Sequence, residues 1–225
     1  MNELATAAAR CREVEKVYRR ATGETHALRG IDADFAAGRL TAVMGPSGSG
    51  KSSLLRILSG LDRPTRGTVE VGDVVVSALG RRDRRRVRRA KLAHVFQRAS
   101  DNLISYLTVA EHLEMSAQLR GRTGADIPGL LDALGLAYRR DNLPHQLSGG
   151  EQQRVAFGQA AIGAPDLIVA DEPSAELDHL SAVALLEIMA RIAHEGTAVI
   201  VATHDPLVAD AADAVLRIER GELVS

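Results

Sequence analysis

The spacing of apolar residues predicts strands in the first part of the chain, followed by a helix. Residues 11–20 and 26–38 alternate loosely between apolar and polar side chains, which is typical of strands with one buried face. Residues 39–45 form a short apolar run that ends in glycine, as fully buried strands often do. Residues 45–61 change from a Gly/Ser-rich stretch to a helical apolar stripe, and two short strands are expected within residues 63–79.

The middle of the chain has a mainly helical pattern. A short strand is expected at residues 91–97, and helices are predicted within residues 107–122, 127–136 and 150–163. This part of the chain therefore differs from the strand-rich segments on either side of it.

Strand patterns return in the last third of the chain. Residues 166–171 and 197–204 are apolar runs of strand length, and residues 181–196 between them have the pattern of an amphipathic helix. Residues 212–225 predict a C-terminal hairpin. Because strands alternate with helices in the first and last thirds, we expect an α/β fold with a mainly parallel sheet, interrupted by a helical insert at residues 98–163.

The composition limits the class of protein. A chain of 225 residues, 45% of them hydrophobic, is long enough for one sizeable core, or for one core with a small inserted subdomain. The formal net charge of −1 and the aromatic content of 3%, with no tryptophan, do not favour a nucleic-acid partner. Cys11 is the only cysteine, which suits a reducing compartment, and no histidine or cysteine spacing predicts a zinc site.

The chain has no segment that predicts a membrane span. No apolar run approaches the roughly 20 residues that cross a bilayer. Residues 1–13 have no apolar stretch of the kind found in secretory signals, so no signal peptide is expected. The protein is not expected to cross a membrane by itself.

The strongest chemical motif lies between a predicted strand and a predicted helix. It has the form G-x-x-x-x-G-K-[ST], in which backbone N–H groups surround phosphate oxygens. Its residues are Gly45, Pro46, Ser47, Gly48, Ser49, Gly50, Lys51 and Ser52. Lys51 can reach the β- and γ-phosphates of a nucleotide, and Ser52 can ligate Mg²⁺. A chance match in this strand–helix context is improbable, so we expect a phosphate-binding loop.

Polar residues at the ends of other predicted strands complete this site. Asp171 and Glu172 end an apolar run, and beside a phosphate-binding loop such a pair can hold Mg²⁺ and activate a water. Gln97 and His204 also follow predicted strands, although neither residue is informative alone. In a parallel sheet the carboxyl ends of the strands form the edge where ligands bind.

A second glycine-rich helix start lies at "HQLSGGEQQRVA", residues 145–156. Ser148 and Glu151 have the spacing of a capping box, in which each side chain bonds a backbone N–H of the other residue. Gly149 and Gly150 leave further N–H groups bare, and a helix start of this kind can also bind an anion. Local sequence alone leaves both interpretations open.

Taken together, these motifs resemble the nucleotide-binding subunit of an ATP-binding cassette (ABC) transporter over nearly the whole chain. The matching segments, in chain order, are the aromatic Tyr18, the Walker A loop at 45–52 with Ser53 after it, the Q-loop Gln97, the signature "LSGGEQQ" at 147–153, Walker B "LIVADE" at 167–172, the D-loop "SAELD" at 174–178 and the switch His204. The resemblance implies a P-loop NTPase (RecA-like) core with an N-terminal antiparallel β subdomain and an inserted α-helical subdomain. Residues 1–97 and 164–225 would form the core and β subdomain, and residues 98–163 the helical subdomain, within a single ABC ATPase domain.

The same resemblance implies roles for these residues. Catalysis would involve Glu172, His204, Lys51 and Gln97, and Mg²⁺ would be held by Ser52, Gln97 and Asp171. Tyr18 would stack on adenine, and the Walker A residues would hold the phosphates of ATP. Family members pack as head-to-tail dimers, so Ser148, Gly149, Gly150 and Glu151 of one copy would meet the γ-phosphate bound by the other copy. Asp178 would link the two sites across the dimer.

The expected partner is an integral-membrane permease, with this chain in the cytoplasm on the inner face of the cell membrane. Within the family, the sequence is most similar to lipoprotein-release and macrolide-efflux ATPases, whose permease is FtsX-like. Two alternatives stay open: a mechanotransmitting or regulatory ABC ATPase that moves no substrate, and, with less support, a soluble ATPase that acts on DNA or ribosomes. Gln159 stands where the family usually has arginine, and it is expected near the ATP face.

The stretch at residues 81–91 holds eight basic residues and one aspartate. A solvated helix face is the first interpretation. Contact with anionic headgroups or with an acidic patch on the permease is the second, and contact with nucleic acid is the third.

Overall fold

The computed structural model describes residues 7–21 and 23–224, with the side chain of Arg20 left out. The prediction that the N-terminus carries no signal peptide rests partly on residues 1–6, which lie outside the described residues. The same is true of Ser225 at the end of the predicted C-terminal hairpin.

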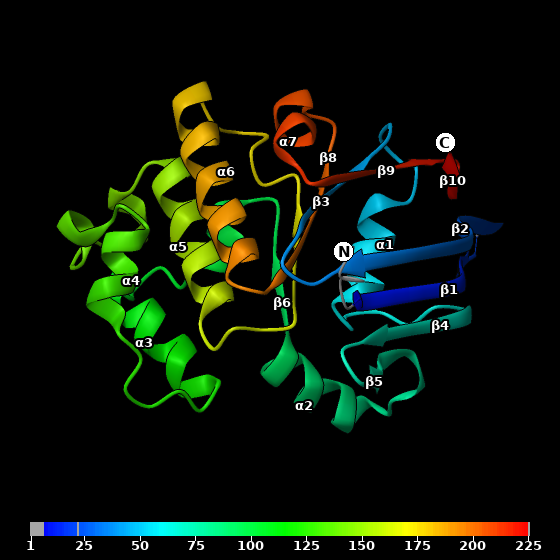
Figure 1. The fold of residues 1–225 in the computed structure, drawn as a ribbon, viewed down its shortest axis with the longest axis horizontal. Coiled ribbons are helices and arrows are strands. Elements are labelled where there is room, and N and C mark those ends of the chain that lie inside the picture. Colours follow the sequence, from blue (N-terminus) through cyan, green and yellow to red (C-terminus); the bar gives the residue numbers. More distant parts are fainter. Residues whose placement is uncertain (1–6, 22, 225) are drawn as a thin grey trace, which may run out of the picture.

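A six-stranded, mainly parallel sheet crosses the centre of the molecule (Figure 1). Its strands, in spatial order, are β10 (Glu222–Val224), β9 (Ala214–Glu219), β3 (Leu40–Met44), β8 (Ala198–Thr203), β7 (Leu167–Asp171) and β6 (Leu92–Val95). All neighbours pair in parallel except β10, which forms an antiparallel hairpin with β9. The α/β class with a mainly parallel sheet, expected from the sequence, is confirmed.

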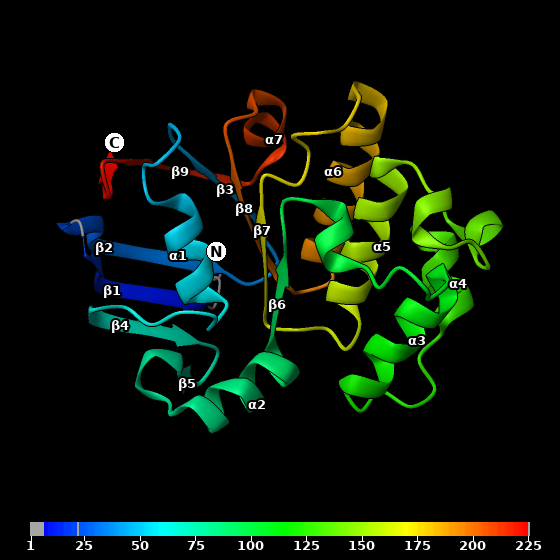
Figure 2. The ribbon, with the colours of Figure 1, turned by 180° about the vertical axis from the view of Figure 1, so that it is seen from behind.

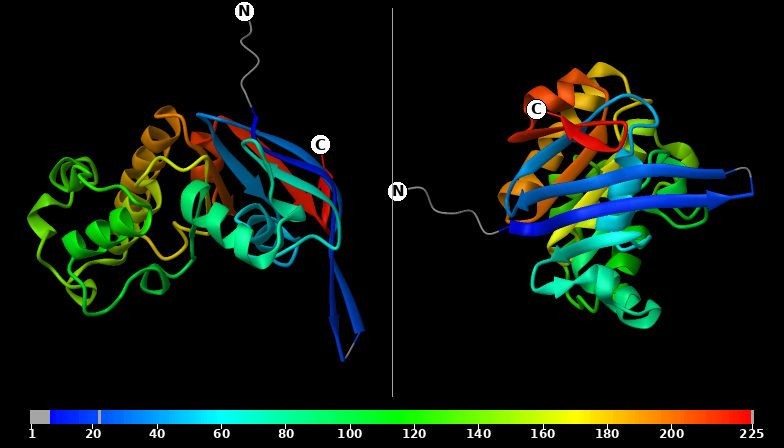
Figure 3. Two further views of the ribbon diagram at one scale, coloured as in Figure 1. Left: turned by 90° about the horizontal axis from the view of Figure 1, so that it is seen from below. Right: turned by 90° about the vertical axis from the view of Figure 1, so that its right-hand side faces the viewer.

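A second, antiparallel sheet is built from the N-terminal strands. Its order is β2 (Gly23–Ala36), β1 (Ala7–Arg20), β4 (Arg66–Val71) and β5 (Val74–Val75). The long β1–β2 hairpin extends well beyond the rest of the molecule at its turn (Figure 3). The N-terminal antiparallel β layer is therefore present.

Seven α-helices connect and cover the sheets within the described part of the chain. They are α1 (Lys51–Leu58), α2 (Arg81–Lys91), α3 (Val109–Leu119), α4 (Ile127–Ala133), α5 (Gly149–Ala161), α6 (His179–His194) and α7 (Pro206–Ala211). Figure 2 shows α3 and α4 together at the side of the molecule opposite the antiparallel sheet. None of the helices in residues 7–21 and 23–224 combines the length and the apolar character of a membrane span.

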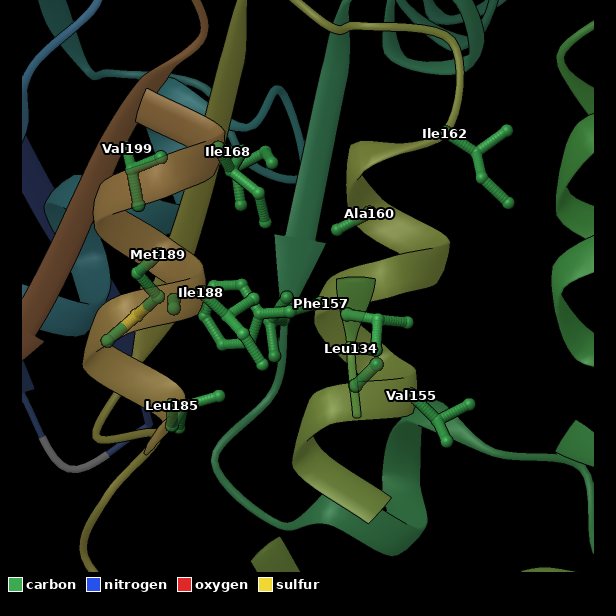
Figure 4. Packing of buried hydrophobic residues seen from close by; sticks show 14 of the residues in the cluster. Leu134, Val155, Phe157, Ala160, Ile162, Ile168, Leu185, Ile188, Met189 and Val199 are labelled. Carbon is green, nitrogen blue, oxygen red and sulfur yellow. The ribbon is translucent and has the colours of Figure 1, made fainter. Parts of the chain in front are cut away.

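The central sheet separates two hydrophobic clusters because its strands alternate their side chains between the two faces. Ile168 and Ala170 of β7 face the cluster formed with α3 to α7, whereas Leu167 and Val169 face α1 and the antiparallel sheet. In Figure 4, Phe157 of α5 lies among apolar side chains of β7, β8 and α6. The signature helix is thus held against the same sheet that carries the phosphate-binding loop.

Two helices differ from the sequence-based expectation, and a third agrees with it. Helix α6 begins at His179 rather than Ser181, because the Asp178 side chain accepts a hydrogen bond from the Ser181 N–H and caps the helix two residues earlier. Helix α7 was not expected, since it has only six residues and begins at a proline. The basic stretch forms α2, none of whose residues is buried.

Candidate functional site

The loop from Gly45 to Ser52 joins β3 to α1 and depends on glycine at two close contacts. A Cβ on Gly45 would lie 2.1 Å from the Ile218 carbonyl oxygen, and a Cβ on Gly50 would lie 2.4 Å from that of Ala27. Both glycines also have positive φ, 153° and 114°, which side-chain-bearing residues rarely adopt. Gly50 precedes α1 and no side chain caps this helix. The first N–H groups of α1 are therefore available to an anionic ligand.

The loop borders a cavity of about 610 Å³, called the P-loop cavity below. Its lining comes from the loop, from the tips of β6, β7 and β8, and from β2. The lining residues are Thr25, His26, Ala27, Ser47, Gly48, Ser49, Gly50, Lys51, Ser52, Ser53, Gln97, Asp171, Glu172 and His204. Most of the residues predicted for the phosphate-binding and catalytic roles are brought together here.

Lys51 places a positive charge at the wall of this cavity. Its ammonium donates to the carbonyl oxygens of Gly45, at 2.7 Å, and Pro46, at 3.2 Å. The Lys51 Nζ also lies 3.9 Å from Glu172 Oε1. The hydroxyl of Ser49 is buried without a hydrogen-bond partner among the described residues. A buried polar atom of this kind at a glycine-rich loop fits a site that binds a polar ligand.

Asp171 ends β7 beside Ser52, the first polar residue after the loop lysine. Burial raises the pKa of the Asp171 carboxyl, while a hydrogen bond from Ser52 opposes that shift and the charge of Glu172 adds to it. A hydroxyl and a carboxylate held together offer the oxygen ligands that Mg²⁺ prefers, with phosphates and water supplying the rest. The donor set therefore fits a magnesium–nucleotide complex.

Glu172 is held in an unusual backbone conformation that directs its carboxylate. Its φ is +45°, and its N–H donates to the Ala202 carbonyl oxygen at 2.8 Å. The carboxylate oxygen Oε2 accepts from the His204 backbone N–H at 3.3 Å and lies 2.9 Å from His204 Nδ1. A left-handed backbone in a residue with a side chain is a form of strain that recurs at functional sites. A carboxylate fixed in this way can orient and deprotonate a water.

Gln97 connects the P-loop cavity to the signature helix. Its side chain is exposed and lines the cavity, while its carbonyl oxygen accepts a hydrogen bond from Gln153 Nε2 at 2.9 Å. Gln153 belongs to α5, so a shift of this helix would reach Gln97 directly. Sequence reasoning predicted Gln97 but not its link to Gln153.

Tyr18 lies beside the loop but is not among the residues that line the cavity. Its hydroxyl lies 3.2 Å from Asp62 Oδ2 and 3.4 Å from Ser53 Oγ, and Lys16 Nζ lies 4.8 Å from the centre of its ring. His26, from the neighbouring strand, lines the cavity instead. No sequence signal singled out His26, because its position follows only from the register of the β1–β2 hairpin.

The start of α5 has the predicted capping box. The Glu151 N–H donates to Ser148 Oγ at 3.2 Å, and the Ser148 N–H donates to Glu151 Oε2 at 2.7 Å. Glu151 also accepts from Tyr138 and Arg139. Although burial alone would raise the pKa of Glu151, these hydrogen bonds lower it to about 2. The capping box does not involve the N–H groups of Gly149 and Gly150.

The start of α6 packs against the start of α5. A Cβ on Gly150 would lie 2.8 Å from the Ser181 side chain, so the close contact requires glycine or a shift of that serine. Ser181 donates to Asp178, which lowers the pKa of the Asp178 carboxyl. Residues 148–151 and 178 form no part of the P-loop cavity lining within the described chain. Within one copy, the phosphate-binding loop and the start of α5 are therefore two separate sites.

Gln159 was expected near the ATP face, and the structure places it elsewhere. Its amide contacts Asn102 and Ser116 and lines a second cavity between α2, α3 and α5. It forms no part of the P-loop cavity lining. Gln159 lies ten residues after Gly149, the first residue of α5, so the rise of the helix carries it away from the signature at the helix start.

The fold and the site define a nucleotide-binding P-loop protein. Residues 28–175 match the family model of the ABC transporters. The chain therefore belongs to the ABC transporter family, and it is an ATPase domain of this family.

Two curated relatives are similar over most of this chain. The macrolide export ATP-binding/permease protein MacB of Campylobacter jejuni is 37% identical over 90% of the chain, although the match covers 32% of that relative. The lipoprotein-releasing system ATP-binding protein LolD 2 of Caulobacter vibrioides is 37% identical over 94% of both chains. The chain thus spans about a third of the macrolide export relative and nearly all of the lipoprotein-release one.

Solved structures of ATP-binding cassettes have the same fold. The dimeric, post-hydrolysis cassette MJ0796 bound to ADP and Pi superposes with a TM-score of 0.85 and 32% identity, over 96% of this chain and 97% of the other. A cbiO1 cassette from Clostridium perfringens, part of the transporter complex cbiONQ, superposes with a TM-score of 0.84 and 26% identity, over 97% of this chain and 87% of the other.

Proposed function

We propose that this chain is the ATP-hydrolysing subunit of a transporter of the lipoprotein-release and macrolide-export type. The observation that carries the proposal is the placement of Glu172, whose carboxylate is fixed by His204 and faces the Lys51 ammonium in the P-loop cavity. The similarity to LolD 2 over 94% of both chains supports the assignment to this type of transporter.

In the proposed reaction, Glu172 orients and deprotonates the water that attacks the γ-phosphate. Lys51 and the N–H groups at the start of α1 stabilise the negative charge on the phosphates. His204 holds the carboxylate of Glu172, and Gln97 lies at the edge of the cavity, where it can sense the attacking water. Mg²⁺, held by Ser52 and Asp171 with Gln97 nearby, would neutralise charge on the phosphate oxygens.

We further propose that two copies close head to tail on ATP. The N–H groups of Gly149 and Gly150, with the Ser148 hydroxyl, would then meet the γ-phosphate held by the partner copy, and Asp178 would lie at the contact. The dimeric ATP-binding cassette MJ0796, bound to ADP and Pi, supports this arrangement by similarity. Within each copy, residues 98–163 would act as the helical subdomain, and residues 1–97 and 164–225 as the core with its β subdomain.

The proposed partner is an integral-membrane permease of the FtsX-like type, and the proposed location is the cytoplasmic face of the membrane. The similarity to LolD 2 and MacB, named for lipoprotein release and macrolide export, supports this placement. Tyr18 remains the proposed adenine contact, although its hydroxyl is engaged by Asp62 in the structure.

The experiment is a steady-state assay of phosphate release by the purified chain. We expect hydrolysis with Mg²⁺, and none after the metal is removed with EDTA. Glu172→Gln should lower the rate by about 100-fold or more, since it removes the general base while keeping the shape of the side chain. A variant that hydrolyses ATP at the wild-type rate would contradict the assignment of Glu172.

A further inference from the structure

Glu151, in the first turn of α5, makes more contacts than its capping box requires. Its side chain is only 7% exposed. Oxygen Oε2 accepts from the Ser148 N–H at 2.7 Å and closes the box. Oxygen Oε1 accepts from the Tyr138 hydroxyl at 2.8 Å and from Arg139 Nε at 2.9 Å, both in the short 3₁₀ helix η3 (Ala137–Arg139). The two carboxylate oxygens therefore bind different segments of the chain.

The capping box of α3 shows that such a box forms without these extra donors. Thr108 and Glu111 make the same two hydrogen bonds, at 2.7 and 3.2 Å. Glu111 is exposed, and no tyrosine or arginine donates to it within the described part of the chain. Because the cap of α3 is complete without such donors, the contacts of Tyr138 and Arg139 with Glu151 have a role other than capping.

The 3₁₀ helix that carries the two donors is fixed in position by α3. The Ala110 N–H, in the first turn of α3, donates to the Arg140 carbonyl oxygen at 3.0 Å. The guanidinium carbon of Arg139 lies 4.9 Å from the centre of the Tyr138 ring, which is a favourable cation–π distance. The two donors are thus held by the backbone beside them and by each other, and they present a fixed surface to Glu151.

The charge of Glu151 has two opposite consequences at the start of α5. A negative side chain in the first turn stabilises a helix. The same charge repels an anion that approaches the N–H groups of Gly149 and Gly150. Arg139 pairs with the carboxylate and offsets this repulsion. Helix α5 can therefore keep its capping acid and still meet a phosphate.

We propose that Tyr138 and Arg139 are positioning residues for ATP hydrolysis. They hold the Glu151 carboxylate, and through it the Ser148 cap, so that the start of α5 accepts the γ-phosphate bound by a partner copy. This inference rests on the proposed head-to-tail dimer, because it names the residues that prepare one half of that site. Neither residue lines the P-loop cavity, so they act on the nucleotide of the partner and not on that of their own copy.

The first test compares the stability of the dimer with ATP binding by one copy. All variants are made in the Glu172→Gln chain, and the dimer dissociation constant in saturating ATP is measured by sedimentation equilibrium. Arg139→Gln should weaken the dimer at least about tenfold, since a hydrogen bond to a charged group is lost in both copies. Titration of the dilute monomer with a fluorescent ATP analogue should give an unchanged affinity. A general loss of structure would lower both affinities together and overturn the proposal.

Arg140→Gln is the matched control, because it removes the same charge one residue away. Arg140 is exposed and pairs with its neighbour Asp141 at 3.9 Å. We expect this variant to change the dimer dissociation constant by less than about twofold. An equal weakening in Arg139→Gln and Arg140→Gln would show a general effect of net charge and contradict the proposal.

A double variant separates the charge of Arg139 from its packing. Arg139→Gln leaves Glu151 with an uncompensated negative charge, and adding Glu151→Gln removes that charge. We expect the double variant to dimerise more tightly than Arg139→Gln alone. A double variant that dimerises no more tightly would mean that Arg139 only braces the cap, against the proposal.

Tyr138→Phe removes one hydroxyl donor and keeps the ring that supports Arg139. We expect the dimer to weaken by about fivefold, which is the effect of one hydrogen bond. Tyr106→Phe makes the same change at a tyrosine that is 76% exposed, and it should leave the dimer unchanged. Equal effects of the two changes would contradict the role of Tyr138.

The parent Glu172→Gln chain keeps this inference distinguishable from the proposed function. If the parent forms no dimer in ATP, the head-to-tail arrangement fails, and the positioning role fails with it. If the parent dimerises and Arg139→Gln dimerises equally well, the proposed function stands and only the positioning role is overturned.

Discussion

The two glycine-rich helix starts of this chain, at α1 and α5, differ in how their backbone N–H groups are satisfied. Helix α1 begins after Gly50 with no side-chain cap and no acidic residue in its first turn. Helix α5 begins after Ser148 with a complete capping box and an acidic residue, Glu151, in its first turn. Both sequences are rich in serine and glycine, yet only the first start is open to a ligand along its whole first turn.

Because of this difference, we expect the α1 start to bind the phosphates of a nucleotide more strongly than the α5 start does. An uncapped helix start with a lysine can hold phosphates alone, because its donors and its positive charge are free. At the α5 start, the capping box uses the N–H of Glu151, and the negative charge of that residue works against a bound anion. The salt bridge from Arg139 to Glu151 offsets this charge. The α5 start therefore suits a secondary contact to a phosphate already held by another copy.

The largest effect is expected from a substitution at the uncapped N-terminus of α1. Gly50→Ala places a Cβ 2.4 Å from the Ala27 carbonyl oxygen at a φ of 114°, so the loop must move. We expect ATP binding to weaken by about 100-fold or more, since the N–H groups that surround the phosphates are displaced. The measurement is titration with a fluorescent ATP analogue.

Gly48→Ala is the control for this variant. Gly48 has a φ of 77° but open space around its Cβ position, so only backbone strain of about 1–2 kcal/mol is expected. If Gly48→Ala and Gly50→Ala weakened ATP binding equally, the close contact with Ala27 would not explain the loss.

The next largest effect is expected at the α5 start, where a substitution should affect ATP hydrolysis but not ATP binding. Ser148→Arg should leave ATP binding by the monomer nearly intact, because Ser148 is outside the P-loop cavity lining. Hydrolysis should fall by about 100-fold, as expected when a donor to the developing charge is lost. The pair of measurements is nucleotide titration and steady-state phosphate release.

Thr108→Arg is matched to Ser148→Arg, because Thr108 caps α3 with the same type of capping box. Both variants lose a cap that contributes about 1 kcal/mol to stability. Only Ser148→Arg should lose hydrolysis. Equal losses of ATP binding and hydrolysis in Ser148→Arg would return the α5 start to a purely structural role.

The smallest effect concerns Glu151. Its folded-state pKa is about 2, lower than the unfolded value of 4.5. Its charge therefore adds stability that is fully present above about pH 4.5 and is lost as the pH falls towards 2. Glu151→Gln should lower the free energy of unfolding by about 2 kcal/mol at pH 7, and this difference should shrink at pH 3. Urea unfolding at the two pH values measures it.

Glu111→Gln is the comparison for Glu151, since Glu111 completes the other capping box but is exposed and has no arginine partner among the residues that the structure describes. We expect a smaller, salt-sensitive loss of stability there. A pH-independent cost of Glu151→Gln would contradict the assigned role of its charge.

Much of the fold was predictable because its strands and helices have clear apolar periods. The motifs at 45–52 and 171–172 also predicted that phosphate-binding residues and carboxylates meet at the P-loop cavity, since parallel strands end at a common edge. Sequence could not give the left-handed conformation of Glu172 or the contact of Gln153 with Gln97, because these depend on how distant segments pack. The expectation that Gln159 lies near the ATP face was wrong, because this residue lies near the far end of α5 and contacts Asn102 and Ser116.

The basic stretch at residues 81–91 also shows that sequence predicts an element but not its contacts with distant segments. Its charge predicted an exposed helix, and α2 is one. What the pattern could not show is that three of its arginines share a cavity with Arg120, which lies some thirty residues further along the chain.

The central claim is that ATP joins the loop of one copy to the α5 start of another, and one measurement tests it most directly. Glu172→Gln, which we expect to bind ATP and to hydrolyse it slowly, is analysed by size-exclusion chromatography with light scattering, with and without ATP. We predict a monomer without nucleotide and a stable dimer with ATP, and a return to monomer when Ser148→Arg is added. A double variant that still dimerises, or a single variant that stays monomeric in saturating ATP, would contradict the account.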